Sequence, residues 1–266
     1  MTSCSLLIST YNWPDALELC LKSVLLQSTM PGEIIICDDG STAETAKVVA
    51  DFTKVSPVPV VHVWQEDKSF RLAMIRNKGF VVATGRYIIQ ADGDLIFHQH
   101  FIRDHLRFAK PGYFTTGSRV LLSLQTTQAL FKNQSLDIQE HSKNNKNFFN
   151  SLYVPALHEF FASRYKNSGK NLYYVKGCNM AFWKEDLLKV NGYNEDFTGW
   201  GKEDSEIAIR LINAGIQKRF LKFGGICYHL FHKEATREME KKNTEMMIDA
   251  QRNKLVRAIN GMDRPK

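Results

Sequence analysis

The first hundred residues alternate between short apolar runs and segments whose apolar residues recur with helical spacing. The apolar runs, each expected to form a strand, are residues 4–10, 33–41, 59–65 and 86–94. The segments expected to form helices lie between them, at 14–28, 42–54 and 71–83. A repeat of strand, helix and strand predicts parallel strands with helices on both faces of the sheet. We therefore expect an α/β protein with a mixed, mostly parallel sheet flanked by helices.

Polar residues follow three of these expected strands at the points where the strands end. They are "STYN" at 9–12, "DDGS" at 38–41 and "DGD" at 92–94. The carboxyl ends of parallel strands lie at one edge of a sheet, and ligands of such proteins bind there. The three motifs are therefore expected to line a single pocket.

The "DGD" motif places Asp92 and Asp94 on either side of Gly93, directly after an apolar run. One interpretation is a tight turn, because Asp-Gly pairs are favoured in turns. The other is a cation site, because a hard divalent metal turns the repulsion between two carboxylates into chelation. The motif alone leaves both interpretations open.

Length and composition are those of a globular protein with a buried core. The chain has 266 residues, of which 44% are hydrophobic and 24% are charged. It contains no apolar run of the roughly 18 residues that a membrane span needs, and no signal-peptide pattern at its N-terminus. Its five cysteines are scattered without a C-x-x-C pair, which favours reduced core thiols. A cytoplasmic protein is expected.

The formal net charge of +7 suits an anionic partner, such as a nucleotide, a phosphorylated glycolipid or an acidic membrane surface. A nucleic-acid-binding role would need a dense basic patch interleaved with aromatic residues, or a known binding module. The sequence shows neither feature, and nucleic acid is not expected as a partner.

The segment "GWGKEDSEIAIRL" at 199–211 carries an aromatic residue and two acids. Trp200 stands between two glycines, as in a loop that presents a ring to a sugar. Glu203 and Asp204 begin a segment with helical spacing. Their structural interpretation is that acids are favoured in the first turn by the helix dipole. Their functional interpretation is that one of them acts as a general base.

Two histidines three residues apart, His229 and His232, follow a short apolar run near the C-terminus. Imidazoles can complete the coordination of a manganese-like ion. For an isolated H-x-x-H pair, one packed and one exposed histidine is the alternative. A further group follows the "DGD" motif and is expected on a surface helix: His98, His100 and His105.

Taken in order, these segments resemble the family 2 glycosyltransferases of the GT-A fold, which is Rossmann-like. The C-terminal half resembles the β-1,4-galactosyltransferases. The resemblance covers about residues 5–232 and is thinnest at 110–170. It depends on six motifs in the family's order: "STYN", "CDDGS", "FRLAMIRNKGF", "DGD", "KGCNMAF" and "GWGKEDSEIAIRL".

The resemblance implies a role for each matching residue on the donor side. The residues it implies for binding the nucleotide or its diphosphate are Ser9, Tyr11, Asp39, Arg71, Arg76 and Asp92. Asp94 would be the direct metal ligand. Either His229 or His232, or both, would complete the coordination of Mn²⁺ or Mg²⁺.

The resemblance also implies the residues on the acceptor side. Asp204 falls at the position of the catalytic base. The residues implied to hold the acceptor or the donor sugar are Trp200, Glu203 and Asn179. The galactosyltransferases carry a second glycine and a third acid where this chain has Lys202 and Ser205. The identities of donor and acceptor therefore stay open.

The activity implied is inverting, metal-dependent transfer of a hexosyl or N-acetylhexosaminyl group. The donor would be a UDP-sugar, and the acceptor a hydroxyl of a glycan or glycolipid in bacterial surface polysaccharide or lipopolysaccharide synthesis. The alternatives are a carbohydrate-binding module with a structural metal and a metal-dependent phosphatase. A phosphatase of the haloacid dehalogenase type would need an aspartate nucleophile after the first strand, where this chain has "STYN". A nicotinamide dehydrogenase would need G-x-G-x-x-G there.

The expected organisation is a GT-A domain at 1–232 and a helical tail at 233–266. Within the domain, residues 1–98 would bind the nucleotide and residues 99–232 the acceptor. Two interpretations of the tail remain open, a helix packed on the domain and a helix that docks on the inner face of the cytoplasmic membrane. The sequence does not determine the oligomeric state.

Overall fold

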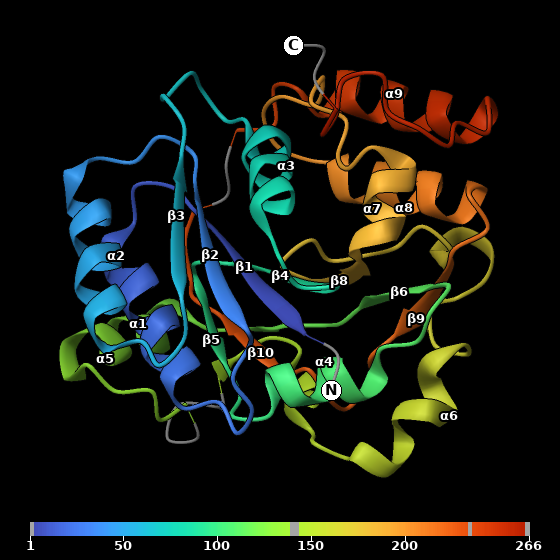
Figure 1. Cartoon of the computed structure of the whole chain (residues 1–266). Coiled ribbons are helices and arrows are strands. Elements are labelled where there is room, and N and C mark those ends of the chain that lie inside the picture. The colour runs from blue at the N-terminus through green and yellow to red at the C-terminus, as the bar shows by residue number, and fades with distance from the viewer. Residues whose placement is uncertain (1–2, 139–143, 234–235, 264–266) are drawn as a thin grey trace.

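The sheet expected for the first hundred residues is present, and it continues into the second half of the chain (Figure 1). The computed structural model describes residues 3–138, 144–233 and 236–263. Among these residues, seven strands form the main sheet in the order β3-β2-β1-β4-β8-β6-β9. Their bounds are Cys4–Thr10 (β1), Glu33–Asp38 (β2), Val60–Trp64 (β3), Tyr87–Asp92 (β4), Tyr113–Thr116 (β6), Asn179–Trp183 (β8) and Gln217–Phe220 (β9).

The first four strands, β1 to β4, are parallel to one another, and the main sheet becomes mixed beyond β4. β1 lies between β2 and β4 and is parallel to both, and β3 is parallel to β2. β8 is antiparallel to β4 and to β6, whereas β9 is parallel to β6. The sequence prediction of an α/β fold with a mixed, mostly parallel sheet is confirmed.

A smaller sheet brings distant segments together beside the end of β4. It contains β5 (Leu95–Phe97), β10 (Cys227–His229) and β7 (Val120–Leu121), in the order β5-β10-β7. β10 is antiparallel to β5, and its last residue, His229, is paired with Leu95. This pairing places the C-terminal histidines next to the "DGD" motif.

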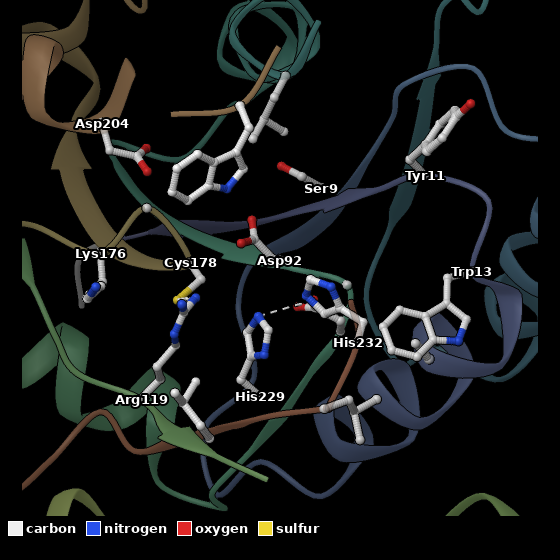
Figure 2. Close-up of a pocket in the computed structure, with 18 of the residues that line it drawn as sticks. Ser9, Tyr11, Trp13, Asp92, Arg119, Lys176, Cys178, Asp204, His229 and His232 are labelled. Atoms are coloured by element: carbon white, nitrogen blue, oxygen red, sulfur yellow. Dashed lines mark hydrogen bonds and ion pairs between the residues drawn. The ribbon is translucent and has the colours of Figure 1, made fainter. Parts of the chain in front are cut away.

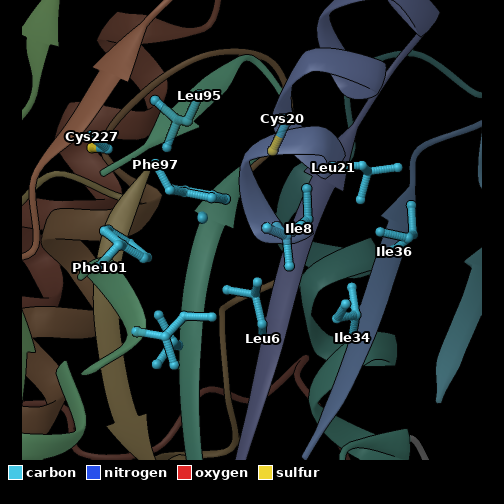
Figure 3. Packing of buried hydrophobic residues seen from close by; sticks show 14 of the residues in the cluster. Leu6, Ile8, Cys20, Leu21, Ile34, Ile36, Leu95, Phe97, Phe101 and Cys227 are labelled. Carbon is cyan, nitrogen blue, oxygen red and sulfur yellow. The ribbon is translucent and has the colours of Figure 1, made fainter. Parts of the chain in front are cut away.

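Helices cover both faces of the main sheet. Successive strand residues point to opposite faces, so each central strand offers apolar side chains to both layers of helices. On one face, Leu6 and Ile8 of β1 pack with Cys20 and Leu21 of α1 (Pro14–Leu25) (Figure 3). Residues of α2 (Ala43–Val55) belong to the same cluster. On the other face, Leu7 packs with residues of α3 (Leu72–Val82), α7 (Lys184–Val190) and α8 (Glu203–Asn213). Each fully buried aliphatic side chain of this kind contributes roughly 1.5–3 kcal/mol.

The remaining helices lie outside these two layers or extend them. They are α4 (Phe101–Phe108), α5 (Leu124–Asn133), α6 (His158–Ala162) and α9 (Glu240–Arg252), with 3-10 turns at Phe148–Ser151, Pro155–Leu157 and Gly169–Asn171. The polar, Asn/Lys-rich sequence at 139–151 is typical of a surface insertion. Residues 139–143 of it lie outside the described residues.

The expectation of a surface helix for His98, His100 and His105 is wrong, because His98 and His100 are half-buried and precede α4, and His105 is turned into the core. This histidine lies on α4 and is fully buried. Burial lowers its pKa to about 4, so the ring is neutral near neutral pH. α4 is amphipathic, and sequence alone did not identify which of its faces is turned inward.

The C-terminal segment contains α9, which lies against α8. Asn243 of α9 is buried, and its Nδ2 donates to the carbonyls of Thr198 (3.1 Å) and Gly201 (3.0 Å). α9 thereby supports the loop that carries Trp200. Among the described residues, no helix is both long and apolar enough to cross a membrane. The division at residues 98 and 232 and the docking of the tail on a membrane stay predictions.

Candidate active site

A cavity of about 980 Å³ opens at the carboxyl ends of β1 and β4 (Figure 2). Most of the site residues expected from the sequence line it. They are Ser9, Tyr11, Asp39, Arg76, Asp92, Asp94, Trp200, Glu203, Asp204, His229 and His232. The roles assigned to these residues stay predictions.

The "DGD" motif forms a turn between β4 and β5. The Gly93 backbone N–H donates to the carbonyl of Ser9 at 2.7 Å, which fixes the turn against the end of β1. A Cβ on Gly93 would lie 3.1 Å from that carbonyl oxygen, so a larger residue would crowd the contact. The turn interpretation is therefore correct, and it does not exclude a cation, because Asp94 lies in the turn beside the histidines.

Asp94, His229 and His232 form a group whose ligand atoms lie within 4.8 Å of one another. Nε2 of each histidine lies 3.2 Å from Oδ2 of Asp94. The other carboxylate oxygen, Oδ1, is buried and has no hydrogen-bond partner among the described residues. Two imidazole nitrogens and a carboxylate oxygen suit an ion such as Mn²⁺, and the group could hold one.

Electrostatics in this group favour a charged carboxylate. Burial opposes ionisation of Asp94, but the hydrogen bond from His232 and the nearby imidazoles outweigh it, so the pKa lies below its usual value. Burial lowers the pKa of His229, whereas the hydrogen bond to Asp94 raises the pKa of His232. The ring of His232 also meets the ring of Trp13 edge-on, with centroids 5.7 Å apart.

Arg76 of α3 joins the two acidic motifs. Its side chain is 1% exposed. Nη2 donates to Oδ1 of Asp92 and Nη1 to Oδ1 of Asp204, both at 2.9 Å. Nε donates to the Ser9 hydroxyl at 3.3 Å. Burial raises the pKa of Asp92 to about 6 although Arg76 opposes the shift, and the charge of Asp94 adds to it.

Asp204, in the first turn of α8, accepts two hydrogen bonds on the same oxygen. The donors to Oδ1 are Arg76 and the Tyr193 hydroxyl, each at 2.9 Å. Within the described part of the chain, Oδ2 accepts no hydrogen bond, and a Cβ added to Gly177 would lie 1.9 Å from it. Only glycine at 177 leaves room for this carboxylate. The side chain is 23% exposed, so one oxygen is free at the cavity.

Glu203 precedes Asp204 and has a different environment. It is 8% exposed, and its Oε2 has no hydrogen-bond partner among the described residues. Burial, together with the charge of Asp204, raises the pKa of Glu203 to about 8. Glu203 is therefore mainly protonated at pH 7, and it can donate a hydrogen bond.

The side of the cavity where the nucleotide was expected is formed by the ends of β1 and β2. Tyr11 is 47% exposed, and its hydroxyl donates to Asp67 at 3.0 Å. Asp39 is buried and accepts hydrogen bonds from the Gln65 side chain and from the backbone N–H of Arg71. Burial raises the pKa of Asp39.

The expectation that the Arg71 guanidinium faces the nucleotide or its diphosphate does not agree with the structure. Nη1 of Arg71 lies 3.4 Å from Sδ of Met74, and Nη2 donates to the carbonyl of Glu66. Arg71 does not line the cavity. Its backbone N–H positions Asp39 instead, because the residue lies just before α3 and its side chain turns away.

The expectation that Asn179 contacts a sugar is also wrong in this structure. Asn179 is fully buried at the start of β8 and does not line the cavity. Its Nδ2 donates to the carbonyls of Ser118 and Gly225, both at 2.8 Å, and its Oδ1 lies 2.9 Å from Nε2 of His105. The amide thereby links the backbone at Ser118 to the backbone at Gly225, and neither residue lies in a strand.

Trp200 lies in a loop of unusual backbone conformation at the cavity. Gly199 and Gly201 have φ values of +67° and +102°, which favour glycine. The indole is 36% exposed, and the Arg237 guanidinium lies 4.9 Å from its ring centroid. An exposed ring at a cavity mouth can stack on a sugar.

Sequence reasoning missed several residues of the cavity wall. Arg119 and Lys176 lie on the same side as Asp204 in the view of Figure 2, opposite Tyr11 and Trp13. Nη1 of Arg119 donates to Sγ of Cys178 at 3.5 Å, and burial raises the pKa of this thiol to about 12. Arg119 carries no motif signal, because it lies in the region of weakest pattern.

The strand order, the helices on both faces and the cavity at the strand ends define the GT-A class of glycosyltransferase folds. The profile of the family described as "Glycosyl transferase family 2" matches residues 5–187, so the chain belongs to this family. A second profile, described as "N-terminal domain of galactosyltransferase", matches residues 158–233. The resemblance expected from the sequence is confirmed.

Curated relatives are similar over most of this chain. Chondroitin synthase of Escherichia coli is 25% identical over 242 residues, which are 85% of this chain and 34% of that protein. Validoxylamine A glucosyltransferase of Streptomyces hygroscopicus subsp. limoneus is 26% identical over 226 residues, 80% of this chain and 48% of that protein. The chain thus spans less than half the length of both relatives.

Two solved structures share the fold. A mannosyltransferase of Pyrobaculum calidifontis in complex with GDP-Man and Mn²⁺ has a TM-score of 0.61 at 18% identity, covering 88% of this chain and 58% of that one. TarS of S. aureus has a TM-score of 0.64 at 13% identity, covering 95% of this chain and 41% of that one.

Proposed function

We propose that the protein is an inverting, metal-dependent glycosyltransferase. It moves a hexosyl or N-acetylhexosaminyl group from a UDP-sugar to a hydroxyl of a glycan or glycolipid, in the synthesis of bacterial surface polysaccharide or lipopolysaccharide. The observation that carries the proposal is that one cavity contains both a metal-ligand group and a carboxylate with a free oxygen. The two are joined through Arg76 and Asp92.

On the leaving-group side, Asp94, His229 and His232 would hold Mn²⁺ or Mg²⁺. When bound, such an ion supplies positive charge that neutralises the diphosphate as it departs. The nitrogen ligands favour Mn²⁺, because Mg²⁺ prefers oxygen. The solved mannosyltransferase with GDP-Man and Mn²⁺ supports this expectation.

The nucleotide would lie along the ends of β1 and β2. Tyr11 presents a half-exposed ring at which a base can stack, and the Asp39 carboxylate lies beside it in the wall of the same cavity. Asp92, in contact with Arg76, lies between this region and Asp204. The exposed Trp200 and the protonated Glu203 would contact the sugars.

On the acceptor side, Asp204 would be the general base. Its Oδ2 would take the proton of the acceptor hydroxyl while the oxygen of that hydroxyl forms a bond to the anomeric carbon. The bond from that carbon to the UDP oxygen breaks in the same displacement. Attack from the face opposite the leaving group inverts the anomeric configuration.

The test is UDP or GDP release from a panel of nucleotide sugars that includes GDP-mannose, with Mn²⁺ or with EDTA. We expect one UDP-sugar to be turned over only with metal, and Asp94→Ala to be inactive. A carbohydrate-binding module with a structural metal would bind glycan but release no nucleotide. The proposal is abandoned if no donor is turned over and UDP fails to bind in the presence of Mn²⁺.

A further inference from the structure

Tyr193 is a buried residue that contacts the proposed base, and no role was expected for it from the sequence. It is fully buried between α7 and α8, and its ring stacks on Phe80 with centroids 5.9 Å apart. Asn77 of α3 binds its backbone twice, as Nδ2 donates to the Tyr193 carbonyl (2.9 Å) and Oδ1 accepts from its N–H (2.8 Å). The position of the ring is therefore fixed.

The direction of the hydrogen bonds at the Tyr193 hydroxyl follows from Gln90 of β4. Nε2 of Gln90 donates to the carbonyl of Gly177 at 2.7 Å and to the Tyr193 hydroxyl at 2.9 Å. Because the Gly177 carbonyl can only accept, the nitrogen of the Gln90 amide, and not its oxygen, must face Gly177 and Tyr193. The hydroxyl then accepts from Gln90 and gives its own proton to Oδ1 of Asp204, at 2.9 Å.

Gln90 is a buried polar residue that contacts the Tyr193 hydroxyl from β4. It is fully buried, and its Oε1 has no hydrogen-bond partner among the described residues. An unpaired buried polar atom costs roughly 1–3 kcal/mol, and the hydrogen bonds that Nε2 donates to Gly177 and Tyr193 offset this cost. The polar residue is explained if its amide orients the Tyr193 hydroxyl.

We infer that Tyr193 and Gln90 are positioning residues for the base, an inference that rests on the function proposed above. Tyr193 and Arg76 both occupy Oδ1 of Asp204 and hold the carboxylate in one orientation. Oδ2 is thereby left free at the cavity to take the proton of the acceptor. Gly177 completes the arrangement, because its missing Cβ makes room for Oδ2.

The decisive variant is Tyr193→Phe, with Tyr87→Phe as its matched control. Tyr87 is equally buried, and its hydroxyl donates to Thr115 at 3.1 Å, away from the cavity. Loss of a hydrogen bond to a charged group predicts that kcat of Tyr193→Phe falls by about 10- to 100-fold. The KM for the donor and the affinity for UDP with Mn²⁺ should not change. Tyr87→Phe should keep the kcat of the wild type, and Gln90→Met should show a smaller loss than Tyr193→Phe.

A second readout is the pH dependence of kcat. Hydrogen bonds donated to a carboxylate favour its charged form, so the acid limb of the profile should move to higher pH in Tyr193→Phe and stay in place in Tyr87→Phe. The charged or titratable groups around the base are Arg76 on α3, Glu203 on α8 and, beyond Arg76, Asp92 on β4. All are intact in both variants.

Asp204→Asn distinguishes a failure of the proposed base from a failure of the positioning role of Tyr193. If Asp204→Asn keeps wild-type turnover, Asp204 is not the base and the proposed mechanism fails. If Asp204→Asn is inactive but Tyr193→Phe matches Tyr87→Phe in kcat and in pH profile, the base stands and the positioning role is overturned.

Discussion

Two acidic pairs contact the same arginine from different elements, and their environments separate their chemistry. Asp92 and Asp94 lie at the end of β4, and Glu203 and Asp204 begin α8. One member of each pair, Asp92 and Asp204, binds Arg76. The outer member differs. Asp94 meets two histidines, whereas Glu203 has no ion-pair partner among the described residues and has a buried, unpaired oxygen.

This difference shows that surroundings, not residue type, decide what a carboxyl group can do. The pKa of Asp94 lies below its usual value, since the hydrogen bond from His232 and the imidazoles outweigh burial. The pKa of Glu203 rises to about 8, because burial and the charge of Asp204 act together. The first pair therefore offers a charged ligand for a cation, and the second offers a base beside a hydrogen-bond donor.

The largest expected effect concerns Asp204, the member of the helix pair that binds Arg76. Asp204→Asn should lower the rate of transfer by about 10²- to 10⁴-fold, because general base catalysis contributes that much. Binding of UDP with Mn²⁺, measured by calorimetry, should be retained. Asp186→Asn is the matched control, since Asp186 lies in the first turn of α7 outside the cavity. A loss of nucleotide binding in Asp204→Asn would contradict the role of a base.

Removing the shared arginine should affect both pairs at once. Arg76→Met leaves Asp92 and Asp204 without their cation, and breaking a buried ion pair costs about 3–5 kcal/mol in the free energy of unfolding. Chemical denaturation measures this loss. Arg210→Met is the control, because Arg210 is equally buried and paired with Glu206 outside the cavity. Both variants should lose stability, but only Arg76→Met should lose activity under conditions where it is folded.

Removing Asp94, the proposed metal ligand of the first pair, should weaken metal binding without unfolding the protein. Asp94→Ala should lower the affinity for Mn²⁺ by at least about 10- to 100-fold, the range seen when only an outer partner of a ligand is lost. Titration followed by Mn²⁺ electron paramagnetic resonance measures it. Asp38→Ala is the control, as Asp38 is a buried aspartate paired with His62 at 3.0 Å. Equal Mn²⁺ affinity in both variants would remove Asp94 from the metal site.

The smallest expected effect concerns Glu203 and its proton. The unfolded chain ionises Glu203 near its ordinary pKa of 4.5, whereas the folded protein keeps the proton up to about pH 8. The free energy of unfolding contributed by this group is therefore lost as pH rises from about 4.5 to about 8. Glu203→Gln cannot ionise, so it should raise Tm by about 2–4 °C for each kcal/mol regained, more at pH 8 than at pH 5.

Glu206→Gln should change Tm in the opposite direction from Glu203→Gln. Glu206 is buried on the same helix but bound to Arg210, so its neutral variant should lower Tm near pH 7. A fall in Tm for Glu203→Gln at pH 7 would contradict the raised pKa of Glu203.

Much of this site could be predicted from the sequence because its motifs follow strands. Ser9, Asp39 and Asp92 were expected at one edge of the sheet, and all three line the cavity. Arg71 and Asn179 were not predictable in this way. The direction of each side chain depends on contacts with residues distant in sequence, such as His105 and Ser118 for Asn179.

The sequence by itself determined the elements of the first hundred residues, their order and the edge at which the polar residues gather. These follow from local patterns, because apolar spacing and turn residues act over a few positions. The tertiary structure decided that β10 pairs with β5 and places His229 beside Asp94, and that Arg76 lies between Asp92 and Asp204. It also decided that Glu203 keeps a proton, because desolvation and charge–charge interactions are set by everything packed around a group, wherever it lies in the chain.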